Sequence, residues 1–151
     1  MGLTTAFKTG LRCLVVLARA GTGPLSAKAL AEELGTSEKY LEQVLLPLRR
    51  AKLIRSQRGT RGGYVLARSP AAVSIAEVMR VLQGPLTLCD CEDGQCHECV
   101  RPELWRSLEV CWDATLGAVT LAHVASDQEL IFSPSRPTLR VGMLCQDGAG
   151  I

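Results

Sequence analysis

Apolar residues recur every three or four positions through the first fifty residues of the chain, which is the spacing of amphipathic helices. The predicted helices span residues 5–20, 27–34 and 38–51. The small-residue turn Gly35–Thr36 and the N-cap residue Ser37 separate the second helix from the third, which is typical of a helix-turn-helix. Pro47 lies inside the third pattern and removes a backbone donor, so a kink or an early end near Leu46 is the alternative to a continuous third helix.

The pattern changes to two short strand-like runs after this third helix. Leu53–Arg58 and Tyr64–Ala67 are predicted strands, and the glycine-rich turn Gly59–Gly63 joins them into a hairpin with arginines at its tip. A helix-turn-helix followed by such a hairpin predicts a winged helix. The expected fold is therefore mainly α with a small β-hairpin wing, and residues 1–83 form a winged helix-turn-helix DNA-binding domain.

Helical spacing returns in the second half of the chain. The capping box Ser74–Glu77 opens a helix that reaches about Leu82. A second stripe, from Pro102 to about Ala125, predicts one long helix. The stripe, at steps of three and four, consists of Trp105, Leu108, Trp112, Leu116, Val119 and His123. Residues 126–151 lose this periodicity and are expected to form a flexible tail.

The long stripe carries two tryptophans on one face, which is more apolar surface than a small winged domain can bury. It therefore predicts a homodimer interface, and the alternative is packing against its own domain. The expected interface residues are Trp105, Leu108, Trp112, Leu116 and Val119.

Charge divides the chain in the same way as the periodic pattern does. Residues 1–70 carry twelve Lys and Arg against four Asp and Glu, whereas residues 71–151 carry five against eleven. A basic first part with an acidic remainder is typical of a DNA-binding module joined to a regulatory part. No apolar run is long enough for a membrane span, and the first residues lack the order of a signal peptide, so a cytoplasmic, nucleoid-associated protein is expected.

Four of the seven cysteines lie between residues 89 and 99, at the spacing C-x-C-x4-C-x2-C. The residues between them are acidic or polar and offer no face to bury, so residues 84–101 are predicted to be a loop. Thiolates suit iron–sulphur clusters and zinc alike, and this compact spacing favours a cluster wrapped by a flexible loop. Zinc binding and simple thiol redox chemistry are the alternatives. Cys13 and Cys111 lie on helix faces and are expected to be buried small residues, whereas Cys145 has no evident partner.

Several segments together resemble the Rrf-type winged-helix transcriptional regulators, the family of IscR, NsrR and CymR. The segments are Leu3–Thr5, Ser37–Gln43, Arg58–Tyr64, Gly84–Leu86 and Leu104–Trp105. The resemblance covers about residues 1–125. It implies a homodimeric bacterial transcription factor that binds double-stranded DNA and often holds an iron–sulphur cluster through three loop cysteines and a fourth ligand.

The resemblance implies Cys99 and Cys96, with Cys91 or Cys89, as the three loop ligands. Some relatives take the fourth ligand from the first helix or from a histidine three residues after the last cysteine. The corresponding positions here are Lys8, Arg12 and Pro102, which cannot bind iron. The expected ligands are therefore all four loop cysteines, with His97 in reserve, around a [2Fe-2S] or [4Fe-4S] cluster.

Polar residues gather in the first half of the third predicted helix, where base edges are read. The candidate DNA-binding residues there and in the wing are Ser37, Lys39, Tyr40, Glu42, Gln43, Arg58 and Arg61. Glu42 can accept from a cytosine amino group and Gln43 can pair with adenine, although either can belong to a solvated face. The resemblance gives the wing arginines a place in the minor groove. Other cations in this part of the chain suit phosphate contacts or solubility, and they are Lys28, Arg49, Arg50, Lys52 and Arg55.

The chain presents no catalytic arrangement. His97 and His123 are its only histidines, and neither has a nucleophile-and-base partner in the sequence. The glycine-rich turn Gly59–Gly63 lacks the ending of a phosphate-binding P-loop. We therefore expect a regulator that is not an enzyme and that has no small-molecule substrate or membrane partner.

Overall fold

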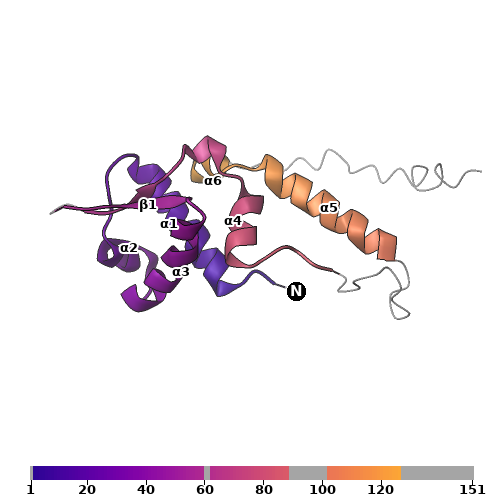
Figure 1. The fold of residues 1–151 in the computed structure, drawn as a ribbon, viewed down its shortest axis with the longest axis horizontal. Coiled ribbons are helices and arrows are strands. Elements are labelled where there is room, and N and C mark those ends of the chain that lie inside the picture. Colours follow the sequence, from indigo (N-terminus) through magenta and orange to yellow (C-terminus); the bar gives the residue numbers. More distant parts are fainter. Residues whose placement is uncertain (1, 60–61, 89–101, 127–151) are drawn as a thin grey trace, which may run out of the picture.

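The computed structural model describes residues 2–59, 62–88 and 102–126. Its elements are α1 (Thr5–Ala20), α2 (Ala27–Leu34), α3 (Glu38–Arg50), β1 (Ile54–Gln57), β2 (Gly63–Leu66), the 3₁₀ turn η1 (Pro70–Ala72), α4 (Ile75–Leu82), α5 (Pro102–Ala118) and α6 (Leu121–Ala125). The predicted winged-helix class is confirmed. In Figure 1 the hairpin projects from the cluster of α1, α2 and α3, and α5 extends away from α4.

Side-chain caps fix where the first helices begin. Each capping oxygen accepts from a backbone N–H three residues further on, which satisfies one of the donors that a helix start leaves without a partner. The capping residues are Thr4, Ser26, Ser37 and Ser74. Gly21 and Gly35 end α1 and α2 with positive φ angles of 64° and 65°. Since these signals are local, the predicted bounds of α1, α2 and α4 are confirmed.

The core is aliphatic, as the low aromatic content predicts. Its fully buried side chains include Leu14, Leu17, Leu30, Leu41, Leu45, Leu48, Leu53, Ile54, Val73, Val78 and Leu121. Gly10 is the point where α1 comes closest to α4, because a methyl group there would overlap Leu82 Cδ1 and lie 3.2 Å from Val44 Cγ1. Pro47 does not end α3, which continues to Arg50, so the alternative of an early end is wrong.

The wing is a two-stranded antiparallel sheet with the register Ile54↔Leu66 to Gln57↔Gly63. A bridge between Leu25 and Tyr64 ties β2 to the segment before α2. Gly63 permits this approach, because a side chain there would overlap the Leu25 backbone. The hairpin is therefore fixed against the helix-turn-helix at its base.

The predicted helix from Pro102 to Ala125 is wrong at its end, because α5 stops at Ala118 and α6 is separate. Thr120 caps α6 in a reciprocal capping box: its Oγ1 accepts from His123 N at 3.3 Å, and Thr120 N donates to His123 Nδ1 at 3.2 Å. Ile75 N donates to Val119 O at 2.9 Å, and Leu121 is fully buried. These contacts with α4 and the core interrupt a stripe that has helical spacing throughout.

No helix in the described ranges is long and apolar enough to cross a membrane. The predicted cysteine loop at 89–99, the wing residue Arg61 and the predicted tail from residue 127 onward lie outside the described residues.

Candidate nucleic-acid interface and sensor segment

Helix α3 divides cleanly into a buried face and an exposed face. Leu41, Val44, Leu45 and Leu48 are buried in the core. The side chains of Lys39, Glu42, Gln43, Leu46 and Arg50 are exposed. With 100° between successive residues, four of these five, at positions 39, 43, 46 and 50, form one stripe along the helix. Three of the predicted DNA-binding residues, Lys39, Glu42 and Gln43, are thus available to a ligand.

The other two predicted residues of α3 have structural roles as well. Ser37 is exposed, and its Oγ accepts from Tyr40 N at 3.2 Å, which leaves the hydroxyl proton free to donate to a phosphate or a base. Tyr40 is half-buried and packs against the hydrophobic core. Ser37 therefore lies at the exposed start of α3, and Tyr40 lies at the edge of the exposed face of this helix.

Sequence reasoning missed Leu46 as a candidate. It is 38% exposed and lies in the middle of the stripe formed by Lys39, Gln43 and Arg50. An apolar side chain at such a position can contact the methyl group of thymine. The signal was present in the helical spacing, but the run of leucines around position 46 concealed it.

Arg58 lies at the end of the wing, directly before Gly59. Arg58 is exposed and directly follows β1. Gly59 has a φ of 128°, and a Cβ on Gly62 would lie 2.6 Å from Gln57 O. These two positions require glycine, and Gly62 N donates to Gly59 O at 2.8 Å.

The described residues on either side of the cysteine loop both contact α5. Leu88 N donates to Glu109 Oε1 at 2.5 Å, and α5 begins at Pro102. The axial rise between Pro102 and Glu109 is about 10 Å at 1.5 Å per residue. The stems of the loop are thus held on α5, although Cys89, Cys91, Cys96, Cys99 and His97 themselves lie outside the described residues.

The remaining thiols lie in contrasting places. Cys13 is fully buried in α1, as predicted, and burial raises the pKa of its thiol to about 12. Cys111 is exposed on α5, so the expectation that it is buried is wrong. Lys8 is exposed on α1, while Arg12 Nη1 donates to Leu34 O at 3.3 Å at the end of α2.

Helix α5 turns much of its apolar surface outward. Leu104, Trp105, Leu108 and Trp112 are each between 37% and 47% exposed. Leu116 and Val119, the other two predicted interface residues, are half-buried and pack on the domain's own core. On the α4 side of α5, Asp113 pairs with Arg80 at 3.6 Å, and Glu109 holds the loop stem.

A winged helix whose exposed recognition face is polar and partly basic defines a DNA-binding protein class. The chain belongs to the Rrf2 family: residues 3–127 match the family described as iron-dependent transcriptional regulator. It is a DNA-binding transcriptional regulator, and its named relatives are regulators and not enzymes.

Two named relatives illustrate the range of this family. The chain is 37% identical to the transcriptional regulator CymR of Bacillus subtilis over 127 residues, which cover 83% of this chain and 91% of that protein. The solved structure of CymR, described as the global cysteine regulator of B. subtilis, matches with a TM-score of 0.73 over 85% of this chain and 99% of that one. The structure of T. potens IscR is 34% identical, with a TM-score of 0.68 over 82% of this chain and 85% of that one.

Proposed function

We propose that this regulator acts as a homodimer that binds a double-stranded operator and responds to redox, nitric oxide or iron–sulphur status through a cluster in the 89–99 loop. The observation that carries the proposal is the place of the residues that flank the loop: Leu88 donates to Glu109 of α5, and α5 itself begins at Pro102. The family description as iron-dependent and the similarity to an IscR structure support the same reading.

For DNA recognition, the exposed stripe of α3 enters the major groove. Glu42 accepts from a cytosine amino group, Gln43 pairs with adenine, and Lys39 and Ser37 contact the backbone or base edges near the start of the helix. Arg58, with Arg61 beyond it in the sequence, enters the minor groove, where narrow A·T tracts concentrate negative potential. Tyr40 supports this face from its edge. Each protomer thereby reads one half-site.

For dimerisation, the exposed side chains of α5 pack against the same helix of a second protomer. Trp105, Leu108 and Trp112 form the centre of this contact, because large exposed apolar side chains gain most from losing contact with water. Leu116 and Val119 lie at its edge, where they already contact the protomer's own core. A two-fold arrangement of this kind places two α3 helices against two half-sites.

The loop residues suit an iron–sulphur cluster by their chemistry. Cys89, Cys91, Cys96 and Cys99 provide four thiolates, the ligand set of both common cluster types. The segment from 89 to 101 is far longer than the stem-to-stem rise of about 10 Å requires, so it has ample length to wrap a bound group. When bound, the cluster supplies a redox-active and nitric-oxide-reactive centre.

The chain's own residues connect this loop to the recognition helix. Gln83, at the end of α4, accepts from Thr4 N at 3.0 Å, which ties the loop stem to the start of α1. Leu82 packs on Gly10, and Val44 of α3 lies next to the same glycine. A displacement of the α4 end therefore presses directly on the point where α1 meets α3.

The test compares anaerobic and aerobic preparations of the full chain. Protein supplied with iron and sulphide should show visible absorbance, acid-labile sulphide and a Mössbauer signal, and its affinity for operator DNA selected from a random duplex pool should change on exposure to air. Cys96→Ala and Cys99→Ala should abolish both the colour and the change in affinity, whereas Cys111→Ala should preserve them. A colourless anaerobic preparation would refute the cluster, and unchanged DNA binding in both loop variants would refute the switch.

A second candidate is a cluster-free regulator that responds through a protein partner or through thiol oxidation. The 37% identity to CymR, whose solved structure is described as a global cysteine regulator, favours this alternative. Metal analysis separates the candidates, since iron with sulphide, zinc, or no metal are three distinct results. If no metal is bound, mixing with candidate partners or mild peroxide should then change DNA affinity.

A further inference from the structure

A basic concavity lies where α3 ends and the wing begins. It has a volume of about 500 Å³ and is lined by Arg49, Lys52, Ile54, Arg55, Ser56, Ala67 and Arg68. Four of these seven residues are cationic, and none is acidic. A concave surface with one sign of charge concentrates ions of the opposite sign.

The backbone of Lys52 is unusual within this concavity. Its φ of 56° is positive, and Lys52 is the only such residue other than glycine in the described ranges. The conformation follows from the reversal at the end of α3, where Leu53 N donates to Leu48 O and Lys52 N donates to Arg49 O, both at 3.0 Å. Glycine adopts this conformation without steric cost, whereas a lysine is strained there. A lysine therefore occupies a position of the concavity at which glycine would be unstrained.

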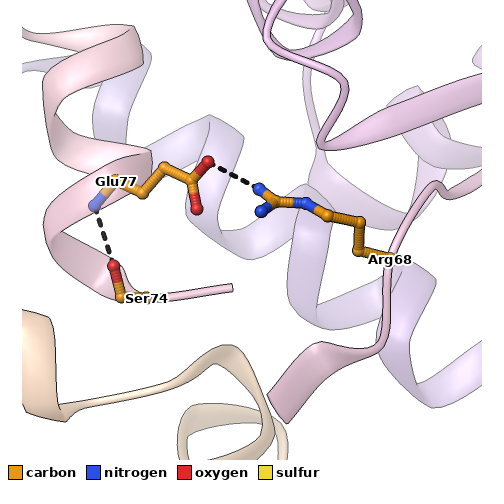
Figure 2. A network of polar contacts seen from close by, with 3 residues as sticks. All are labelled: Arg68, Ser74 and Glu77. Atoms are coloured by element: carbon orange, nitrogen blue, oxygen red, sulfur yellow. Dashed lines mark hydrogen bonds and ion pairs between the residues drawn. The ribbon is translucent and has the colours of Figure 1, made fainter. Parts of the chain in front are cut away.

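Three of the four cations are available to a ligand. Arg68 is already paired, because its Nη2 lies 2.6 Å from Oε1 of Glu77, a residue of α4 whose backbone N–H donates to the capping residue Ser74 (Figure 2). Arg49, Lys52 and Arg55 are exposed and have no carboxylate partner within the part of the chain that the structure describes. The Arg55 guanidinium lies beside the Gln57 amide, whose oxygen, when turned toward it, accepts at 3.2 and 3.3 Å.

We propose that Arg49, Lys52 and Arg55, with the Ser56 hydroxyl, form a phosphate-binding site separate from the base-reading half of α3. Arginine and lysine side chains together with a hydroxyl are the groups that bind phosphate oxygens. The helix dipole already favours cations at the end of α3, but it does not account for a lysine at a left-handed position or for Arg55 on the wing.

A phosphodiester of the bound operator is the source that the geometry favours. Helix α3 has 13 residues, so it is about 20 Å long, whereas the major groove is only about 12 Å wide. When the first half of the helix reads bases, its last turn lies over the sugar–phosphate backbone. Arg50 continues the exposed stripe to this end of the helix, next to Lys52. This step rests on the proposed placement of α3 in the groove, and the alternative source is a free phosphate ion.

Lys52→Gly gives the sharpest test, because it removes the side-chain charge and at the same time relieves the steric strain of the positive φ at this position. Its melting temperature should equal that of the wild type or exceed it by up to about 3 °C. Its affinity for operator and for unrelated duplexes should fall several-fold to a similar extent, and the slope of log K against log salt should decrease by about 0.9 for one lost phosphate contact. Arg55→Gln should lower affinity in the same way, whereas Lys8→Gln, which removes an exposed charge on α1, should not.

A second arm separates the two sources of phosphate. Wild type and Lys52→Gly are heated in inorganic phosphate and in chloride at equal ionic strength, without DNA. A phosphate-specific stabilisation that only the wild type shows, with unchanged DNA binding in Lys52→Gly, assigns the site to free phosphate. Loss of DNA affinity with the reduced salt slope assigns it to the operator backbone. If Lys52→Gly changes neither property, the site is refuted.

Gln43→Ala distinguishes a failure of this site from a failure of the proposed recognition by α3. If Gln43→Ala loses sequence preference and Lys52→Gly leaves the salt dependence unchanged, only the proposed phosphate site is refuted. Unchanged sequence preference in Gln43→Ala would instead contradict the role proposed for α3.

Discussion

Helices α3 and α5 are both amphipathic, yet they use their apolar faces in opposite ways. Helix α3 buries Leu41 and Leu48 completely in its own domain and exposes polar residues, whereas α5 leaves Trp105 and Leu108 more than a third exposed. Helix α3 therefore gains its stability within the protomer and presents a mainly polar exposed face. Helix α5 instead leaves large apolar side chains exposed within the described residues.

The contact between α5 and the domain shows the same contrast. Buried aliphatic side chains hold α3 against α1 and α4. On α5, by contrast, the side toward α4 carries the Arg80–Asp113 ion pair and the Glu109 contact to the loop stem, and Leu116 is only half-buried. A helix attached in this way can respond to a change at the loop without loss of the core.

The largest expected effect is on the folded state, through α3. Leu41→Ala removes a fully buried side chain and should lower the free energy of unfolding by about 2–5 kcal/mol. Urea unfolding at several protein concentrations measures this, and Gln43→Ala on the exposed face of the same helix is the matched control, with a change below about 0.5 kcal/mol. A loss below about 1 kcal/mol for Leu41→Ala would contradict the burial of this face.

The corresponding change in α5 should affect association instead. The double variant Trp105→Ala/Leu108→Ala should raise the dimer dissociation constant by about 30-fold or more, since the centre of an interface carries about 2 kcal/mol or more of binding energy. Sedimentation equilibrium measures the constant, and the helical content of the protomer should be retained. Val110→Ala is the control, because Val110 is 68% exposed and lies about 200° around the helix from Leu108. Equal effects of the two substitutions would place the interface elsewhere.

The core, to which α1 contributes Cys13, and the exposed face of α5, which carries Cys111, also differ in their thiols, and this predicts a dependence on pH. Cys13 has its pKa raised from 9.0 to about 12 by burial, so its protonated form is favoured in the folded state. The stability from this protonated thiol is fully present below pH 9 and is lost as the pH rises from 9 toward 12. At pH 10 the loss is about 1.4 kcal/mol relative to pH 8.

The measurement is the free energy of unfolding of wild type and of Cys13→Ala at pH 8 and pH 10. The wild type should lose about 1.4 kcal/mol more than the variant over this range. Cys111→Ala, in the exposed face of α5, should keep the full wild-type pH dependence. If Cys13→Ala loses as much stability as the wild type, the buried thiol is not the group that titrates.

Sequence reasoning succeeds where local signals decide the structure. The predicted caps Ser37 and Ser74 lie next to the helices that they start, so the sequence around each start is enough to locate it. The end of α5 could not be found in this way, because the apolar spacing continues through Val119 and the break comes from hydrogen bonds with Ile75 and Val73, more than forty residues earlier in the chain.

The same distinction between local signals and distant contacts applies to the residues of the candidate site. Helical spacing alone located the exposed face with Lys39, Glu42 and Gln43. It did not reveal that Lys52 has a positive φ or that Cys111 faces outward, because both depend on how neighbouring elements pack. Pairing within the wing brings Arg55 and Arg68 to one concavity, although thirteen positions separate them in the sequence.

The smallest expected effect concerns the polar attachment of α5 to α4. Asp113→Asn breaks the ion pair with Arg80. Asp113 Oδ1 and Arg80 Nε lie 3.6 Å apart, and the two side chains are 64% and 55% exposed, respectively. Water screens such a pair, so the free energy of unfolding should change by less than about 0.5 kcal/mol. Leu116→Ala, one turn along the same helix, should cost more because Leu116 packs on the core. If the ion pair proves the stronger of the two, charge and not apolar contact fixes α5 on its domain, and the contrast between α5 and α3 becomes sharper still.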